Sequence, residues 1–244
     1  MKAMILAAGL GTRLRPLTNN KPKALVELAG KTLLEHSVEK LISAGVKDIV
    51  INVHHFHDMM KEFISGLDYG KVNLQISDEK DLLLDTGGGL WNARSFFDDG
   101  MPFLLINVDI VSDIDLKALY KSHVEKHALA TLAVSTRKST RTFLWENGRL
   151  CGWRNNNTGE EILSYQPQNT PQQLAFSGIH CISPGIFKLY QGHDVFSIKD
   201  VYLELASIQA IKPFLHDAAC WFDTGTVETL NNAAKYLEGK YKSI

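Results

Sequence analysis

Short apolar runs and segments with helical apolar spacing alternate along the first part of this chain. The runs are of strand length, and those at 48–53 and 103–107 are apolar at most positions. Runs of this kind are typical of strands buried on both faces of a parallel sheet. The pattern predicts strands at residues 4–8, 48–53, 72–77, 103–107 and 129–135.

Between these runs, apolar residues recur every three to four positions. Leu34, Val38 and Leu41 share one helical face, and Gly45 follows as a stop signal. The same spacing predicts helices over 58–65, 86–97 and 115–126. Alternating strands and helices favour an α/β fold with a mostly parallel, mixed sheet flanked by helices. In such sheets ligands bind beyond the carboxyl ends of the strands.

From about residue 137 shorter strands and turns such as Asn147-Gly148 replace this alternation, which indicates a smaller, β-rich lobe. No Pro/Gly/Ser-rich linker separates the two parts. We therefore expect one domain over 1–244, with a first half of about 1–135 and a lobe of about 136–244. Expected strands are 142–146, 150–154, 162–165, 174–182 and 219–222, and expected helices are 184–190, 198–208 and 227–238.

Composition narrows the class of partner. The formal net charge is −1 and 45% of residues are hydrophobic, so we expect neither nucleic acid nor a membrane as a partner. The cysteines Cys151, Cys181 and Cys220 are far apart and lack metal-ligand spacing, which favours reduced thiols in a cytoplasmic protein. No signal peptide is evident. The histidines at 54, 55 and 57 have no carboxylate or cysteine at helpful spacing, so we expect a solvated loop there.

A glycine turn directly after the first strand is the strongest chemical signal. Gly9 and Gly11 allow a tight turn whose backbone N–H groups form an anion-binding concavity. Arg13 can grip phosphate oxygens with its planar fork, and Lys23 supplies a point charge. The turn lacks the Gly-Lys-Ser/Thr ending of a Walker A loop, and Leu14 replaces the last glycine of a dinucleotide fingerprint. We therefore expect a polyphosphate ligand of another class.

Two aspartates at predicted strand ends are candidates for holding Mg²⁺, which polyphosphate chemistry needs to offset charge. Asp109 follows the buried run 103–107, and Asp223 follows Trp221-Phe222. Each alone could instead be a turn or N-cap residue. Asp113 and Asp115 are better explained as loop and N-cap residues. The glycines at 87–89 could let a base lie against the backbone, or could serve only close helix packing.

These motifs together resemble the sugar-1-phosphate nucleotidyltransferase family. The opening segment 6–18 with Lys21-Pro22-Lys23 is the most specific match, and the similarity runs in order along nearly the whole chain. The supporting segments are 49–52, 86–89, 107–109, 176–179 and 221–226.

The resemblance implies a Rossmann-like fold, and roles for individual residues. Arg13, Lys23 and Asp109 would be catalytic, and Asp109 with Asp223 would hold Mg²⁺. The acceptor sugar would contact Asn107, Thr142, Ser177 and Gly178. The nucleoside triphosphate would contact Ala7, Gly9, Gly11, Thr12, Arg13, Lys23, Glu79, Gly87 and Gly88.

Within the family, the chain resembles the short N-acetylmuramate 1-phosphate uridylyltransferase type, because Asp85 precedes the Thr-Gly-Gly-Gly run. UTP with an amino-sugar 1-phosphate is the expected pair. Mannose-1-phosphate guanylyltransferases, which use GTP, have a similar opening motif. We expect a monomer or a small homo-oligomer.

The sequence departs from the family pattern at two places, both in the part of the site that would bind the acceptor sugar phosphate. Many relatives carry a Glu-Lys-Pro segment whose lysine holds the sugar phosphate, and here the region reads Tyr165-Gln166-Pro167. Thr142 stands where the muramate type has an aspartate before phenylalanine. Arg141 and Arg154 are candidate replacements for the missing cation.

Two alternatives belong to other classes. A catalytically silent domain that senses nucleotide sugars would be expected to lack Lys23, Arg13 or a metal aspartate, and all are present. A glycosyltransferase needs an Asp-x-Asp metal motif; Asp113-Ile114-Asp115 has the spacing but lies outside the strand-end position.

Overall fold

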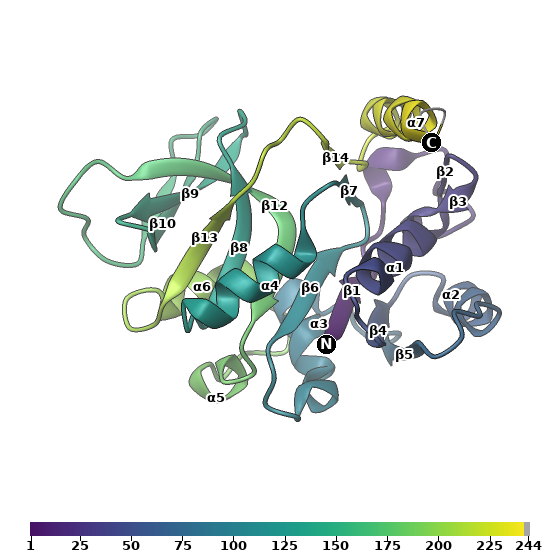
Figure 1. Ribbon diagram of the computed structural model, residues 1–244, viewed down its shortest axis with the longest axis horizontal. Helices are drawn as coiled ribbons and strands as arrows, with labels where there is room; N and C mark the ends of the chain where they lie inside the picture. Colours follow the sequence, from purple (N-terminus) through teal and green to yellow (C-terminus); the bar gives the residue numbers. More distant parts are fainter. Residues whose placement is uncertain (242–244) are drawn as a thin grey trace. The chain divides into compact units, whose positions relative to one another are not determined.

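The computed structural model describes residues 1–241 of the 244-residue chain, which forms two compact units (Figure 1). Unit 1 contains Met1–Leu83, Ile106–Asp113 and the chain from Cys220 onward, and unit 2 contains Leu84–Leu105 and Ile114–Ala219. The expected single domain, with a first half of about 1–135 and a lobe of about 136–244, stays a prediction. No helix within residues 1–241 is both long and apolar enough to cross a membrane.

Unit 1 is built on a parallel sheet. Strand β1 (Lys2–Leu6) pairs with β4 (Asp48–Val53), and β4 pairs with β5 (Asn73–Asp78). The apolar run of β1 is buried without alternation, as in strands covered on both faces. Leu6 lies beside Asn52, and Asn52 beside Ser77, so the carboxyl ends of the three strands meet at one edge.

Two helices connect these strands. Helix α1 (Leu33–Ser43) begins with a capping box between Thr32 and Glu35 and is followed by Gly45 in the left-handed region. Helix α2 (His57–Ser65) lies between β4 and β5 in the chain. Figure 1 shows both helices beside the β1–β4–β5 sheet. This strand–helix alternation confirms the predicted α/β class.

Short elements complete unit 1. The 3-10 helices η1 (Thr12–Leu14) and η2 (Lys23–Leu25) follow β1, and β2 (Glu27–Leu28) forms a hairpin with β3 (Lys31–Thr32). Strand β7 (Ile110–Ser112) pairs antiparallel with β14 (Trp221–Asp223), and α7 (Val227–Tyr241) follows. The pairing of β7 with β14 joins segments more than 100 positions apart, so local periodicity could not reveal it.

Unit 2 is centred on β8 (Ala130–Ser135), which pairs parallel with β13 (Ile211–Leu215) and antiparallel with β12 (Gln172–Ile182). The first residues of β12, Gln172 to Leu174, pair with β9, which begins an antiparallel meander. Its strands are β9 (Arg141–Glu146), β10 (Arg149–Asn155) and β11 (Glu161–Leu163). Strand β6 (Phe103–Asn107) crosses the boundary between the units in sequence.

The helices of unit 2 are shorter than the sequence predicts. The expected helix over 86–97 is α-helical only in α3 (Asp85–Asn92), and Ala93 at φ −90° and ψ 5° separates it from η3 (Arg94–Phe97). Asp115 caps α4 (Leu116–Glu125), as predicted, by accepting from the N–H groups of Lys117 and Ala118. The others are α5 (Ile186–Leu189) and α6 (Ile198–Leu205).

Strand β12 contains a wide bulge. Phe176 pairs with Val134 and His180 with Leu132, so four steps along β12 match two steps along β8. Gly178 lies inside this bulge at φ +74°. Such a bulge bends a strand and redirects its side chains.

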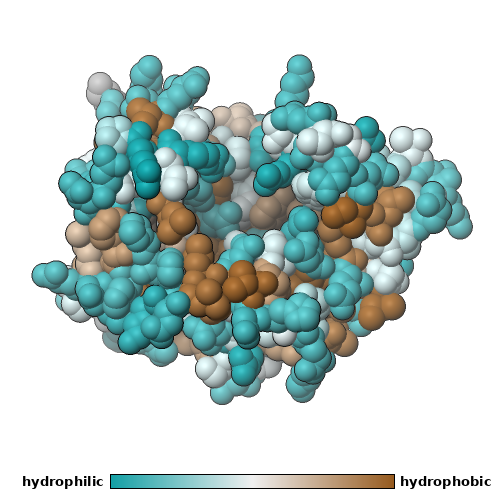
Figure 2. Space-filling model, turned by 180° about the vertical axis from the view of Figure 1, so that it is seen from behind, coloured by the Kyte–Doolittle hydropathy of each residue, from teal (hydrophilic) through white to brown (hydrophobic). Residues whose placement is uncertain are grey.

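The surface in Figure 2 is predominantly hydrophilic, with hydrophobic side chains in small separate patches. Exposed large apolar residues are correspondingly spread along the chain, and the most exposed is Ile208 at 70%. Scattered apolar residues of this kind are ordinary for a protein surface.

Candidate active site

The glycine turn of unit 1 is held from both sides. The Ala7 N–H donates to Asn52 Oδ1 at 2.7 Å, and the Thr18 hydroxyl donates to the Gly11 carbonyl at 2.8 Å. Gly11 has φ +64°, and a Cβ there would lie 2.9 Å from Lys23 Cβ. Backbone conformation and packing therefore both require glycine at position 11.

Gly9 has a different reason to be glycine. A Cβ at this position would meet no protein atom within 4 Å, and its φ is not in the left-handed region. The side chains of Leu10, Thr12 and Arg13 are exposed around it. The open surface of the turn therefore offers backbone N–H groups to a ligand, as a phosphate site requires.

Lys23 and Asp109 form an ion pair between Lys23 Nζ and Asp109 Oδ2. The two side chains are only 11% and 16% exposed. Lys23 begins η2 after Pro22, and the Leu25 N–H donates to the Pro22 carbonyl at 3.0 Å. The structure thus brings together two predicted catalytic residues that are 86 positions apart.

The β7–β14 ribbon places Asp223 beside Asp109. Asp223 pairs with Ile110, the residue after Asp109. The Thr224 N–H and hydroxyl both donate to the Asp109 carbonyl at 2.9 Å. Thr224 is fully buried, so these bonds fix the backbone that carries both carboxylates.

Arg13 lies over the turn that follows Asp223. A Cβ at Gly225 would be 2.6 Å from Arg13 Nη2 and 2.7 Å from Asp223 Oδ1. The Gly225 N–H also donates to Asp223 Oδ1 at 2.9 Å. Glycine at 225 therefore makes room for a guanidinium next to the second aspartate.

Glu79, the predicted base contact, lies in a buried polar chain at the end of β5. It is 3% exposed, and its Oε1 accepts from Asn52 Nδ2 at 2.7 Å. Its carbonyl lies 2.7 Å from His54 Nδ1, which donates to it because a carbonyl only accepts. Asn52 thus connects Glu79 to Ala7 of the glycine turn.

Asp109 and Asp223 suit Mg²⁺, which proteins usually hold by one or two carboxylates while water and substrate oxygens complete the shell. Within residues 1–241 no group of three or more His, Cys, Asp or Glu side chains could hold a metal ion. A metal at this ribbon would therefore take most of its ligands from substrate and water.

Gly87 and Gly88, in unit 2, are closely packed. Their N–H groups donate to the Phe196 carbonyl at 2.9 and 3.1 Å. A Cβ at Gly87 would lie 2.4 Å from a ring carbon of Phe196, and one at Gly88 would lie 2.5 Å from the Asp194 carbonyl. Packing alone therefore requires both glycines, and their contact with a base stays a prediction.

The predicted sugar residues lie on different elements. Asn107 ends β6 in unit 1. In unit 2, Thr142 on β9 is buried and donates to Gln173 Oε1 at 3.2 Å. Ser177 and Gly178 lie in the bulge of β12, where Ser177 is fully buried against His216.

Other candidates have structural roles. His57 lies 3.6 Å from carboxylate oxygens of Asp58 and Asp78. Asp113 accepts from the Tyr236 hydroxyl. All three cysteines are free, and burial raises the pKa of the Cys151 thiol to about 11. A thiol with so high a pKa is protonated near neutral pH and unreactive.

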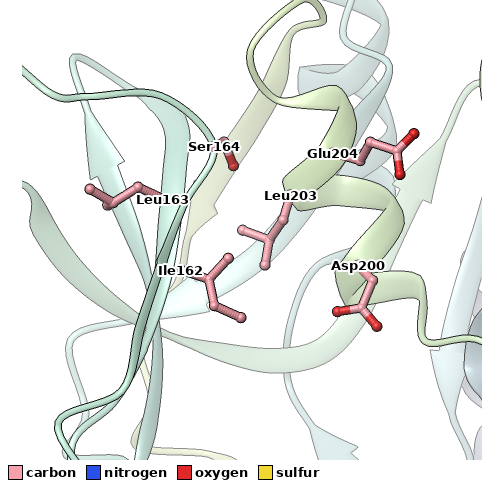
Figure 3. A pocket seen from close by; sticks show the side chains of 6 residues that line it. All are labelled: Ile162, Leu163, Ser164, Asp200, Leu203 and Glu204. Atoms are coloured by element: carbon pink, nitrogen blue, oxygen red, sulfur yellow. The ribbon is translucent and has the colours of Figure 1, made fainter.

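A pocket of about 360 Å³ lies elsewhere in unit 2, between β11 and α6 (Figure 3). Its lining is apolar and acidic, which does not suit a phosphate ligand. None of the candidate site residues line it. The lining residues are Ile162, Leu163, Ser164, Asp200, Leu203 and Glu204.

Comparison with known proteins assigns the chain to a family. The model of the nucleotidyl transferase family matches residues 2–240. The chain belongs to this family. N-acetylmuramate alpha-1-phosphate uridylyltransferase of Neisseria meningitidis serogroup B is 33% identical over 250 residues, covering 99% of this chain and 100% of that protein. The predicted family is thereby confirmed.

Other relatives match over shorter stretches. The Caulobacter vibrioides protein of the same name is 44% identical over 111 residues, and the match covers 45% of this chain and 46% of the relative. Mannose-1-phosphate guanylyltransferase catalytic subunit beta of Dictyostelium discoideum is 41% identical over 127 residues, 50% of this chain and 35% of the relative. These matches thus span less than half of each relative.

Solved structures support the Rossmann-like nucleotidyltransferase fold. UDP-glucose pyrophosphorylase complexed with UDP-glucose has a TM-score of 0.76 at 19% identity and covers 98% of both chains. HddC from Yersinia pseudotuberculosis complexed with GMP-PN has a TM-score of 0.73 at 21% identity and covers 97% of this chain and 99% of that one.

Sequence reasoning placed Asn52 at a strand end that could converge with the glycine turn, and its bond from the Ala7 N–H confirms that contact. It gave Thr224 and Arg137 no role of their own. Asn52 interrupts an apolar strand run, and a buried amide there was a usable signal. Thr224 and Arg137 act through long-range bonds to main-chain carbonyls. Such bonds have no signature in local sequence.

Proposed function

We propose that the protein transfers a nucleotidyl group from a nucleoside triphosphate to a sugar 1-phosphate. A phosphate oxygen of the sugar 1-phosphate attacks the α-phosphorus of the triphosphate. The bond from this phosphorus to the bridging β-oxygen breaks, and pyrophosphate leaves in line. No covalent intermediate on the protein is required, so catalysis depends on positioning and charge stabilisation.

The Lys23–Asp109 pair under the glycine turn is the observation that carries this proposal. The open backbone of Gly9 and the exposed Arg13 cradle the triphosphate. Lys23 would contact the α-phosphate, and Asp109 with Asp223 would hold Mg²⁺. Mg²⁺ bound there would offset charge on the triphosphate and the departing pyrophosphate.

UTP with N-acetylmuramate 1-phosphate is the favoured substrate pair. It is supported by similarity to the Neisseria uridylyltransferase over both full lengths. GTP with mannose 1-phosphate is the second candidate, supported by the Dictyostelium relative over half of this chain. We place the reaction in the cytoplasm, where activated sugar precursors are made.

Pyrophosphate release across a matrix of triphosphates and sugar 1-phosphates tests the proposal. One pair should give turnover with Mg²⁺, and chelation should abolish it. Lys23→Ala and Asp109→Ala should each lower kcat by about 10²–10³-fold, by analogy with loss of one oxyanion donor. Tight binding of a nucleotide sugar with no turnover of any pair would instead identify a silent sensing domain.

A further inference from the structure

Two parallel strands of unit 2 end side by side. Val134 of β8 pairs with Leu215 of β13, and the His216 N–H donates to the Val134 carbonyl at 3.0 Å. Arg137 follows the end of β8, and His216 follows the end of β13. Ligands of α/β sheets bind beyond such carboxyl ends, so this edge is where a ligand of unit 2 is expected.

The bulge of β12 faces the same strand ends. It replaces regular pairing between Phe176 and His180 and contains Gly178 at φ +74°. Bulges are frequent next to active sites, where they re-aim a group or end a ladder. Here the bulge frees the Phe176 carbonyl to accept from a side chain.

Arg137 is anchored on that bulge. Its Nη2 donates to the Phe176 carbonyl at 2.6 Å, and its Nη1 donates to Ser135 Oγ at 3.4 Å. The side chain is half-buried. A guanidinium is always charged and has five N–H donors in a planar fork that matches phosphate. Anchoring reduces the entropy that the side chain would lose on binding.

The Ser177–His216 pair holds the bulge in place. Asp217 O lies 2.7 Å from His216 Nδ1, so that nitrogen carries a proton. The other ring nitrogen, His216 Nε2, is hydrogen-bonded to the Ser177 hydroxyl at 2.7 Å. Ser177 is fully buried, so in this conformation it acts through its neighbours and does not contact a ligand.

Other cations of unit 2 are placed less suitably for a phosphate. Arg154 lies on β10 and donates to Glu161 Oε2 of the neighbouring β11 at 3.2 Å, away from the ends of β8 and β13. Arg141 is exposed at the start of β9. Lys212 lies near the amino end of β13, the end opposite to His216. Arg137 alone among these four is both at the strand ends and anchored on the bulge.

We infer that Arg137 binds the phosphate group of the acceptor sugar 1-phosphate and supplies the cation that Tyr165-Gln166-Pro167 lacks. Ser177 and His216 are positioning residues that fix the carbonyl on which Arg137 rests. Since this assignment names the acceptor site of the proposed function, its test separates the KM of the sugar phosphate from that of the triphosphate.

Steady-state kinetics with the active pair found in the matrix tests Arg137. Arg137→Gln should raise the KM of the sugar 1-phosphate about 10- to 100-fold, the effect of losing charge-assisted hydrogen bonds. The triphosphate KM should stay within about threefold, since uniform loss of acceptor binding leaves the other substrate unaffected. Arg137→Lys keeps the positive charge without the planar fork, so its KM for the sugar 1-phosphate should lie between those of wild type and Arg137→Gln. Lys138→Gln, an exposed neighbour, is the matched control and should match wild type.

Ser177→Ala should raise the same KM about 3- to 10-fold with kcat preserved, because it disturbs the anchor only. An unchanged sugar-phosphate KM in Arg137→Gln and Arg137→Lys would overturn the assignment, as would a rise in Arg141→Gln or Arg154→Gln in its place. Equal rises of both KM values would mark a general folding effect and also overturn it. Wild type inactive with every pair would overturn the proposed function itself.

Discussion

Because Lys23 and Asp109 form an ion pair, we predict that the effect of removing either charge on the free energy of unfolding depends on whether the other charge is present. Asp109→Asn leaves the Lys23 ammonium facing a neutral amide in a site where the lysine is 11% exposed. Removing one partner of a fully buried pair costs about 3–5 kcal/mol, whereas exposed pairs contribute below about 1 kcal/mol. With both side chains less than one-fifth exposed, we expect about 2–3 kcal/mol for Asp109→Asn and a similar loss for Lys23→Met.

The double variant should lose no more stability than either single variant. Lys23→Met with Asp109→Asn removes both charges, so the free energy of unfolding should fall by about 2–3 kcal/mol, not by the sum of about 4–6 kcal/mol. Urea unfolding of the four proteins, without Mg²⁺ or nucleotide, measures this coupling energy. Additivity of the two single changes within about 0.5 kcal/mol would show that the pair is not coupled and would refute the reasoning.

Three further predictions address the turn, the ribbon and unit 2. Gly11→Ala should destabilise the fold by about 1–3 kcal/mol, because position 11 has φ +64° and a Cβ there would contact Lys23. Gly9→Ala should leave stability within about 0.5 kcal/mol and raise the triphosphate KM. Thermal unfolding and steady-state kinetics of the two variants test both expectations. Thr224→Val should raise the Mg²⁺ concentration for half-maximal activity about 10-fold, since it removes one of the two hydrogen bonds that hold the Asp109 carbonyl. A Mg²⁺ titration of activity that matches wild type contradicts this expectation. Burial lowers the pKa of His180 to about 3, so the full contribution of its neutral form to stability is present above pH 6.5. As pH falls from 6.5 towards 3, the free energy of unfolding should drop by about 1.4 kcal/mol per pH unit. Urea unfolding at pH 7.5 and pH 5 should show a smaller drop in His180→Gln than in wild type, and an equal drop argues against His180 as the origin.

The sequence allowed most elements and part of the site to be predicted. The strand at 48–53 and the strand at 103–107 were predicted at their observed bounds, because uninterrupted apolar runs mark buried parallel strands. Lys23 and Asp109 were predicted to act together, and they form an ion pair.

The sequence did not predict strands whose residues lack a strand-like pattern and that are recognised only by their pairing with a distant strand. β13 contains Pro213 and polar Lys212, and only its alignment with β8 makes it a strand. Local patterning does not contain this alignment.

The order of segments in unit 1 has a consequence for biosynthesis. The glycine turn and Lys23 emerge early from the ribosome, but β14 and Asp223 come about 200 residues later. Until then Asp109 has no Thr224 to fix its carbonyl, and β7 has no partner strand. Most of unit 2 is synthesised in that interval, so it can fold first, while unit 1 waits for a contact of very high sequence separation. A chain that stops before residue 220 would therefore retain the glycine turn and lose β14 with Asp223. Under the proposed function, such products would bind nucleotide without turning it over.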